Sequence, residues 1–464
     1  MNKFKLAAAL LGSTALFVAT PAMAQESLPD AQQQPEPEAP DTSDATADQA
    51  IAATAPVADD RAQIDLLQAQ VEALQESLEA LKKQVAASTP TWKGAPQFAD
   101  KEGGWSFKPR GRLQYDVGYV GHPDGYQNKG LGFGNEIRRA RLGVEGSLPG
   151  EFGYKFELDF AGGEVEFADA YLSKAVGAWE FILGQHNNFQ SLEELTSSLN
   201  SSFIERAAFT DAFNFERRVG ASAQYAKGPL LAQAGVFTDS IADLNSVGDD
   251  NNSYSFDGRL VYAPLVGSNQ LHFGASAHWR DLQDAATSVR YRQRPAVHFT
   301  DVRFIDTGSI GGAKAETGYG LEAAGIFGPF YVASEAFWQK VSREGLSDPT
   351  FFGAYVDAGY FFTGESRGYK GGKFDRVKVK HPFNKGGWGS FGANVRWDYL
   401  DLADAGIVGG KQNAFQFSLN WKPIDYVLFG FNVAHIVYRD AAIAVDGNRD
   451  YSVNVAGLRS QVDF

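Results

Sequence analysis

The feature that most constrains this fold is a two-residue periodicity that begins near Trp105 and continues to the C-terminus. Large apolar residues occupy every second position, and charged or polar residues occupy the positions between them. The first segment alternates two sets, Leu113, Tyr115, Val117 and Tyr119 against Arg112, Gln114 and Asp116. Successive side chains of a β-strand point to opposite faces, so each segment predicts a strand with one apolar face. A soluble sandwich and a membrane barrel both fit this period.

The number and spacing of these segments favour the barrel. We predict sixteen strands, at residues 105–120, 135–147, 152–161, 165–174, 178–187, 216–226, 229–238, 253–264, 270–280, 317–327, 329–341, 350–362, 387–400, 411–422, 425–439 and 450–464. An even number of antiparallel strands, with tight turns at one end and long loops at the other, is typical of outer-membrane barrels. Two connections do not fit this difference in length: the one at Gly162 should be external yet is very short, and the one at 363–386 should be periplasmic yet is long. We expect the long one to fold into the lumen.

The last segment, residues 450–464, gives a second signal. It is half apolar, it has at least the roughly 9 to 11 residues with which a strand crosses a bilayer, and it ends on Phe464. It resembles the closing strand of bacterial outer-membrane barrels, where that strand is the sorting and assembly signal. Taken alone, it equally fits an ordinary strand of a soluble protein.

The N-terminal hundred residues predict three further regions. Residues 1–24 read as a signal peptide, with Lys3 and Lys5 before an apolar run and a small-residue cleavage site at its end. Residues 25–59 form an acidic, Pro-rich linker that we expect to be disordered. Residues 60–87 predict a coiled coil, and 100–464 the membrane barrel. We expect the barrel in a Gram-negative outer membrane, with linker and coil in the periplasm.

The predicted coil rests on a heptad pattern. Its apolar residues recur at alternating steps of three and four, at Ile64, Leu67, Val71, Leu74, Leu78, Leu81 and Val85. Such a stripe predicts self-association through one narrow seam. β-branched residues at the first core position of such a stripe lean toward dimers. A single amphipathic helix docked on the barrel is the alternative.

Composition excludes several function classes. The chain has no cysteine, and its seven histidines lack the spacing of a zinc enzyme, so we expect neither a metal nor a cofactor. Its glycine clusters do not sit between a strand and a helix, which argues against a nucleotide site. The formal net charge is −14, and much of it lies in the linker. We therefore expect no nucleic-acid partner and no enzymatic activity.

Several stretches in the barrel region resemble the phosphate- and polyphosphate-selective porins of Gram-negative outer membranes, the O/P porin family. They are 137–146 (IRRARLGVEG), 169–172 (DAYL), 184–185 with 192–197 (LEELTS), 203–206 (FIER), 361–367 (FFTGESR) with Tyr369, 374–377 (FDRV) and 386–389 (GGWG). The resemblance implies a trimeric sixteen-stranded barrel that passes phosphate or polyphosphate by diffusion. It also implies that loops 188–215 and 281–316 fold inward and form the constriction.

Arginines are the expected anion ligands, because a guanidinium stays ionised and makes paired hydrogen bonds to phosphate. Strand parity points Arg112, Arg139, Arg141 and Arg218 into the lumen, and the second loop carries Arg290, Arg292 and Arg294 on one face of an extended segment. Arg303 follows in that loop, and the resemblance adds Arg206. Each could instead pair with a lumen carboxylate or with lipopolysaccharide.

We therefore expect an anion-selective porin with an arginine-lined constriction. Acids such as Glu157, Asp159 and Glu205 could neutralise the arginines and leave a general porin. A second alternative is an envelope tether, in which the barrel anchors a coil that contacts the cell wall or a periplasmic partner. An outer-membrane enzyme is the weakest rival, because no histidine stands convincingly beside a serine in the strands.

Overall fold

The computed structural model describes residues 57–88, 90–92, 94–100, 102–126, 130–246 and 252–464. The predicted signal peptide lies outside these residues, and so does the predicted linker except for its last three positions, which belong to a helix. The predicted region boundaries at the N-terminus thus stay predictions.

The N-terminal element is a single helix, α1 (Val57–Ser88), which contains the predicted heptads. Six of its seven stripe residues have 50 to 68% of their surface exposed: Ile64, Leu67, Val71, Leu74, Leu78 and Leu81. An apolar stripe this narrow is suited to a partner helix. None of the helices in the described part of the chain has the length and hydropathy of a membrane span.

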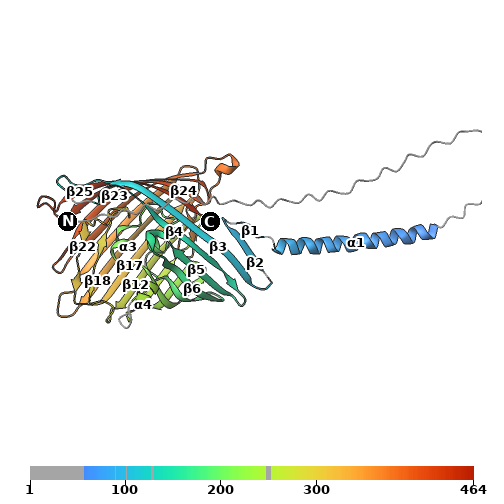
Figure 1. The fold of residues 1–464 in the computed structure, drawn as a ribbon, viewed down its shortest axis with the longest axis horizontal. Coiled ribbons are helices and arrows are strands. Elements are labelled where there is room, and N and C mark those ends of the chain that lie inside the picture. Colours follow the sequence, from blue (N-terminus) through green and yellow to red (C-terminus); the bar gives the residue numbers. More distant parts are fainter. Residues whose placement is uncertain (1–56, 89, 93, 101, 127–129, 247–251) are drawn as a thin grey trace, which may run out of the picture. The chain divides into compact units, whose positions relative to one another are not determined.

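Sixteen antiparallel strands close into a barrel (Figure 1). The last strand, β25 (Tyr451–Asp463), pairs with the first, β3 (Trp105–Val120), with Leu458 opposite Val117. Between them, in chain order, lie β4 (Gly132–Leu148), β5 (Phe152–Asp159), β6 (Glu166–Val176), β7 (Trp179–Asn187), β8 (Arg217–Lys227), β9 (Leu230–Phe237), β10 (Tyr254–Tyr262), β12 (Asn269–Asp281), β17 (Ala313–Phe327), β18 (Phe330–Arg343), β19 (Thr350–Phe361), β22 (Ser390–Asp404), β23 (Ile407–Ile424) and β24 (Val427–Arg439). Short strands β1 (Thr91–Trp92) and β2 (Pro96–Asp100) form a hairpin that extends β3, and β11 (Leu265–Val266) pairs with β12. The predicted fold class is confirmed.

Burial in the barrel is inverted relative to a soluble protein. Gln114, Asp116 and Glu157 are buried on the inner face, while Leu113 and Phe156 are exposed on the outer face. A soluble sandwich buries its apolar face and exposes its polar one. The alternation of an apolar outer band with a polar interior is the pattern of a transmembrane barrel. The same two-residue period therefore has its apolar side toward lipid.

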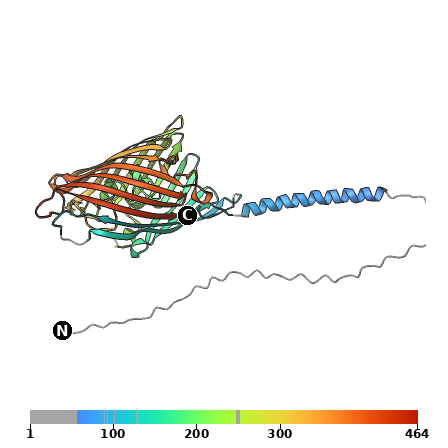
Figure 2. The ribbon, with the colours of Figure 1, turned by 90° about the horizontal axis from the view of Figure 1, so that it is seen from above.

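Connections at the two ends differ in length, as Figures 1 and 2 show. The end that carries Trp105 and Phe464 has tight turns such as 177–178 and 328–329, with one long exception at 362–389. The opposite end carries the long connections 188–216 and 282–312. Short turns face the periplasm in outer-membrane barrels, so the Trp105 end is the periplasmic one.

The connection 188–216 folds into the barrel. It contains α2 (Leu192–Leu195) and α3 (Ala208–Ala212), whose side chains are largely buried. The carboxylate of Glu335 on β18 accepts hydrogen bonds from the backbone N–H groups of Leu192 (2.8 Å) and Glu193 (2.7 Å). These bonds satisfy donors that the start of a helix leaves unpaired. Asp398 on β22 does the same for Ala208 (2.8 Å), so the wall holds both helices.

Two other segments meet this loop inside the lumen. The connection 282–312 forms two small ladders, β13 (Ser288–Val289) with β16 (Ile310–Gly311) and β14 (Arg292–Gln293) with β15 (Ile305–Asp306). From the periplasmic end comes the hairpin of β20 (Gly368–Lys370) and β21 (Lys373–Asp375). Phe374 N donates to Thr196 Oγ1 (3.3 Å), and Tyr369 Oη lies 2.6 Å from His272 Nδ1 on the wall. The long periplasmic connection therefore enters the lumen.

Candidate anion pathway in the barrel lumen

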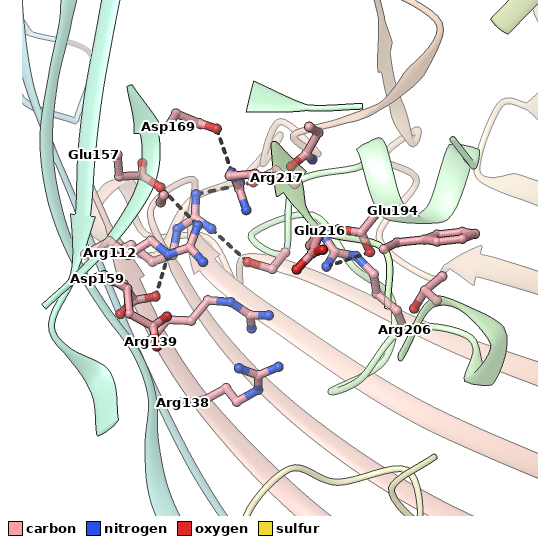
Figure 3. Close-up of a pocket in the computed structure, with 18 of the residues that line it drawn as sticks. Arg112, Arg138, Arg139, Glu157, Asp159, Asp169, Glu194, Arg206, Glu216 and Arg217 are labelled. Atoms are coloured by element: carbon pink, nitrogen blue, oxygen red, sulfur yellow. Dashed lines mark hydrogen bonds and ion pairs between the residues drawn. The ribbon is translucent and has the colours of Figure 1, made fainter. Parts of the chain in front are cut away.

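A polar cavity of about 910 Å³ lies in the lumen, between strands β3 to β8 and the inward segments. Ten cationic and nine acidic side chains line it, so its formal charge is close to zero. Figure 3 shows the guanidinium groups of Arg112, Arg139 and Arg138 pointing into the same space. Which of these cations are neutralised by neighbouring acids therefore decides what the cavity attracts.

The first wall of the cavity is the β3–β4 pair. In the observed register Arg112 stands opposite Arg141, and Gln114 stands opposite Arg139. The next inward position of β3 is Arg110, about 6.6 Å along the strand, because residues of one face repeat every second position. A β-bulge leaves Arg138 without a partner between the pairs Gln114–Arg139 and Tyr115–Ile137. The extra residue lets Arg138 and Arg139 both face the lumen, which strict alternation forbids.

Most of the cations are paired with acids. Arg141 binds Glu157 (3.0 Å) and Asp159 (2.7 Å) on the neighbouring strand. The other cations that line the cavity and pair with a described acid are Arg110 with Glu145 (2.5 Å), Arg138 with Glu205 (2.9 Å), Arg217 with Asp169 (2.6 Å), Lys155 with the same Asp169, Arg206 with Glu194 (3.3 Å), and Arg294 with Asp211 (3.5 Å) and Asp301 (3.4 Å). These pairs hold the wall and the loops together and contribute little net charge.

Two arginines of the cavity bond only to neutral groups within the described residues. Arg112 Nη1 donates to Ser198 Oγ (2.8 Å), and its buried Nε has no hydrogen-bond partner. Arg139 Nη1 donates to Gln114 Oε1 (3.0 Å). Lys373, from the periplasmic hairpin, also lines the cavity and forms no ion pair with any described residue. The net positive charge therefore concentrates on these three side chains.

Two carboxylates of the inward loop differ in how firmly they stay ionised. Burial works against ionisation of Glu205, but Arg138 and Arg459 outweigh it and hold the pKa of Glu205 well below its ordinary value. Burial raises the pKa of Glu194, and the attraction of Arg206 offsets that rise only in part. Of these two carboxylates, Glu194 is therefore the one that takes up a proton first as the pH falls.

Five of the nine arginines predicted from the sequence line this cavity: Arg112, Arg139, Arg141, Arg206 and Arg294. Four do not. Arg218 is buried between Glu216 (2.5 Å) and Asp239 (3.6 Å). Arg290, bound to Asp306, and Arg292 are exposed, because the alternation of this segment buries Tyr291 and Gln293 instead. Arg303 is buried, and this burial together with Arg294 lowers its pKa to about 10.

Sequence reasoning missed five cations of the cavity: Arg110, Arg138, Lys155, Arg217 and Lys373. Arg110 and Lys155 share parity with residues already placed inward, so the same count finds them. The alternation places Arg138 on the outer face, because it does not account for the bulge. Arg217 is the first residue of its strand, where the alternation gives no direction. Lys373 required knowing that the hairpin turns inward. Among the described residues, no group of three or more metal-ligand side chains is present.

The fold and the charged lumen define the class of the protein as a β-barrel channel of the outer-membrane type. A family model described as "Phosphate-selective porin O and P" matches residues 107–464. The chain therefore belongs to this porin family, and the resemblance drawn from its sequence is confirmed. Its location is the Gram-negative outer membrane, and the family indicates a channel rather than an enzyme.

The chain is similar to two further proteins by sequence and to two solved structures. An uncharacterized protein of Caulobacter vibrioides is 49% identical over 390 residues, which cover 82% of this chain and 78% of that protein. Porin O of Pseudomonas aeruginosa is 27% identical over 377 residues, covering 72% and 84% respectively. Among solved structures, an anion-selective porin from Comamonas acidovorans covers 78% of this chain and 100% of its own, at 14% identity and a TM-score of 0.49. DcaP of Acinetobacter baumannii covers 79% and 99%, at 16% identity and a TM-score of 0.46.

Proposed function

We propose that this porin gives passive, anion-selective diffusion of phosphate or polyphosphate, and that Arg112 and Arg139 form the constriction with the loops that face them. The observation that carries the proposal is their bonding: both guanidinium groups line the cavity, and among the described residues they bond only to neutral partners. A guanidinium without a carboxylate keeps its charge and its donors for a passing anion.

The distribution of acids supports the same direction. Glu164 and Glu166, which form no ion pair with any described residue, are exposed at the connection between β5 and β6. The deeper acids, such as Glu157 and Asp169, are bound to arginine or lysine. Of the described acids that line the cavity, those without an ion pair thus lie at the rim, whereas arginines without a carboxylate partner lie inside. This separation favours a selective anion channel over a general porin.

We further propose a homotrimer whose coils associate along the stripe of α1. The six exposed stripe residues support it, because an isolated helix leaves this apolar surface in water. We also propose that the coil contacts the cell wall and that arginines at the rim of the barrel contact lipopolysaccharide. These contacts leave the channel function unchanged.

The reversal potential of the purified protein in a planar bilayer under a KCl gradient tests the function. The expected potential has the sign of chloride permeation, and added phosphate reduces the chloride current at low concentration. Comparing phosphate with tripolyphosphate then identifies which anion is bound more strongly. A cation-selective potential would overturn the proposal and leave a general porin.

A further inference from the structure

The segment from Arg376 to Gly389, which we call the periplasmic foot, is strongly basic. It holds Arg376 and three lysines, Lys378, Lys380 and Lys385, with no aspartate or glutamate, in a chain whose net charge is −14. The three lysines and His381 are all exposed. In Figure 1 this orange segment projects beyond the strand ends near the C-terminus, on the periplasmic side of the barrel.

The foot also exposes two large aromatic side chains. Phe383 is 63% exposed and Trp388 is 79% exposed. The indole Nε1 of Trp421 donates to the carbonyl oxygen of Trp388 (2.8 Å). Trp421 stacks on Phe391 and Phe429, which belong to the exposed outer face of the barrel. Trp388 thus continues the lipid-facing aromatic surface at the periplasmic edge.

Three of the acids near the foot are already engaged. Arg376 binds the carboxylate of Asp463, and Asp425 Oδ1 accepts from the backbone N–H of Val379 (2.8 Å). Glu365 is fully buried and accepts from the backbone N–H of Lys380 (3.1 Å). Lys378 and Lys385 form no ion pair with any described residue, so their charges are available to a partner.

We propose that the periplasmic foot binds anionic phospholipid headgroups of the inner leaflet of the outer membrane. Lysines that flank exposed aromatic residues at a bilayer edge are the combination that holds a segment at the headgroup level. The hydrogen bond between Trp421 and Trp388 favours lipid over an acidic protein, because it fixes the foot beside the hydrocarbon surface. Phe383 and Trp388 would enter the interface, and Lys378 and Lys385 would bind phosphate oxygens.

The test places the full protein in phosphatidylcholine bilayers that contain brominated phosphatidylglycerol or, at equal fraction, brominated phosphatidylcholine. The signal is the quenching of Trp388 fluorescence, obtained by subtracting the Trp388→Phe variant. We expect stronger quenching by the anionic lipid, since each lysine near an anionic surface contributes about a fivefold preference. Lys378→Gln with Lys385→Gln removes the preference, whereas the charge-matched pair Lys227→Gln with Lys314→Gln, both exposed lysines elsewhere on the barrel, retains it.

Equal quenching by the two lipids overturns the proposal. It is also overturned if both double variants lose the preference for the anionic lipid to the same extent. If the preference for the anionic lipid appeared only after deletion of the acidic segment 25–56, the foot would bind that segment of the chain instead of lipid. None of these outcomes depends on ion selectivity, so the channel function is tested separately.

Discussion

Arg112 and Arg139 differ from the neighbouring arginines of the cavity in what they bind. Arg138 and Arg141 donate to carboxylates, and their charges are cancelled where they stand. Arg112 and Arg139 donate to a serine hydroxyl and a glutamine carbonyl, which orient the guanidinium without cancelling its charge. In the proposed channel, anion selectivity therefore depends on which arginines are paired with carboxylates more than on the number of arginines.

Replacing Arg139 with Gln should weaken anion selectivity. A unit charge about 4 Å from a passing ion contributes about 1 kcal/mol in water, which is about fivefold in the chloride-to-potassium permeability ratio. The ratio is measured from the reversal potential in a planar bilayer. Arg290→Gln is the matched control, because Arg290 is exposed on its loop outside the cavity and should leave the ratio unchanged. An equal drop in both variants would contradict this assignment.

Anion selectivity should also rise as the pH falls into the mildly acidic range. Burial raises the pKa of Glu194, so this carboxylate is neutralised before ordinary acids titrate near about pH 4. Protonation removes one negative charge and leaves Arg206 uncompensated, so the sign of the change is toward anions. Glu194→Gln should show the acid-form selectivity already at neutral pH. A variant with the wild-type pH curve would show that another group is responsible.

At the scale of the elements, loop 188–216 is held by carboxylates of the wall rather than by its own helices, which are only four and five residues long. Glu335 and Asp398 together accept from three backbone N–H groups of this loop. Short helices have little stability of their own, so the loop depends on contacts with the wall, and these anchors are among them.

Removing both anchors, by Glu335→Ala and Asp398→Ala, should free the loop while the barrel stays closed. Each buried N–H group left without a partner costs about 1 to 3 kcal/mol. The expected result is a larger and noisier single-channel conductance with weaker selectivity. Glu344→Ala, at an exposed ion pair with Lys314, is the control. Unchanged conductance in the double variant would mean that other contacts hold the loop.

The strands could be predicted from the sequence because a period of two recurs from Leu113 on β3 to Val462 on β25, with local interruptions at β-bulges. The site could be predicted only in part. Arg138 could not be predicted, because a single bulged residue reverses the alternation of inward and outward side chains. Lys373 could not be predicted, because nothing in its local sequence shows that its hairpin turns inward. Arg290 and Arg292 do share a face, as alternation predicts, but that face lies away from the cavity. Which face of a loop meets the lumen is decided by its partners, here the buried Tyr291.

At the scale of the whole molecule, the coil and the channel are expected to be separable. Deleting residues 61–86 should leave conductance and selectivity unchanged, because the cavity is built from barrel residues alone. It should lower the temperature at which oligomers dissociate on a gel, since the apolar stripe of α1 is lost. If the deletion abolished conduction, the barrel would depend on the coil for its structure, and an envelope tether would be favoured instead.

The measurement that tests the central claim most directly is a phosphate titration of the chloride current. It compares the wild-type channel with the Arg112→Gln, Arg139→Gln double variant, and uses Arg290→Gln with Arg292→Gln as the charge-matched control. We predict that the same low phosphate concentration blocks the chloride current of the wild type and of the control. The double variant should require a much higher phosphate concentration for the same block. Equal block in all three channels would show that the two unpaired arginines do not bind the permeating anion.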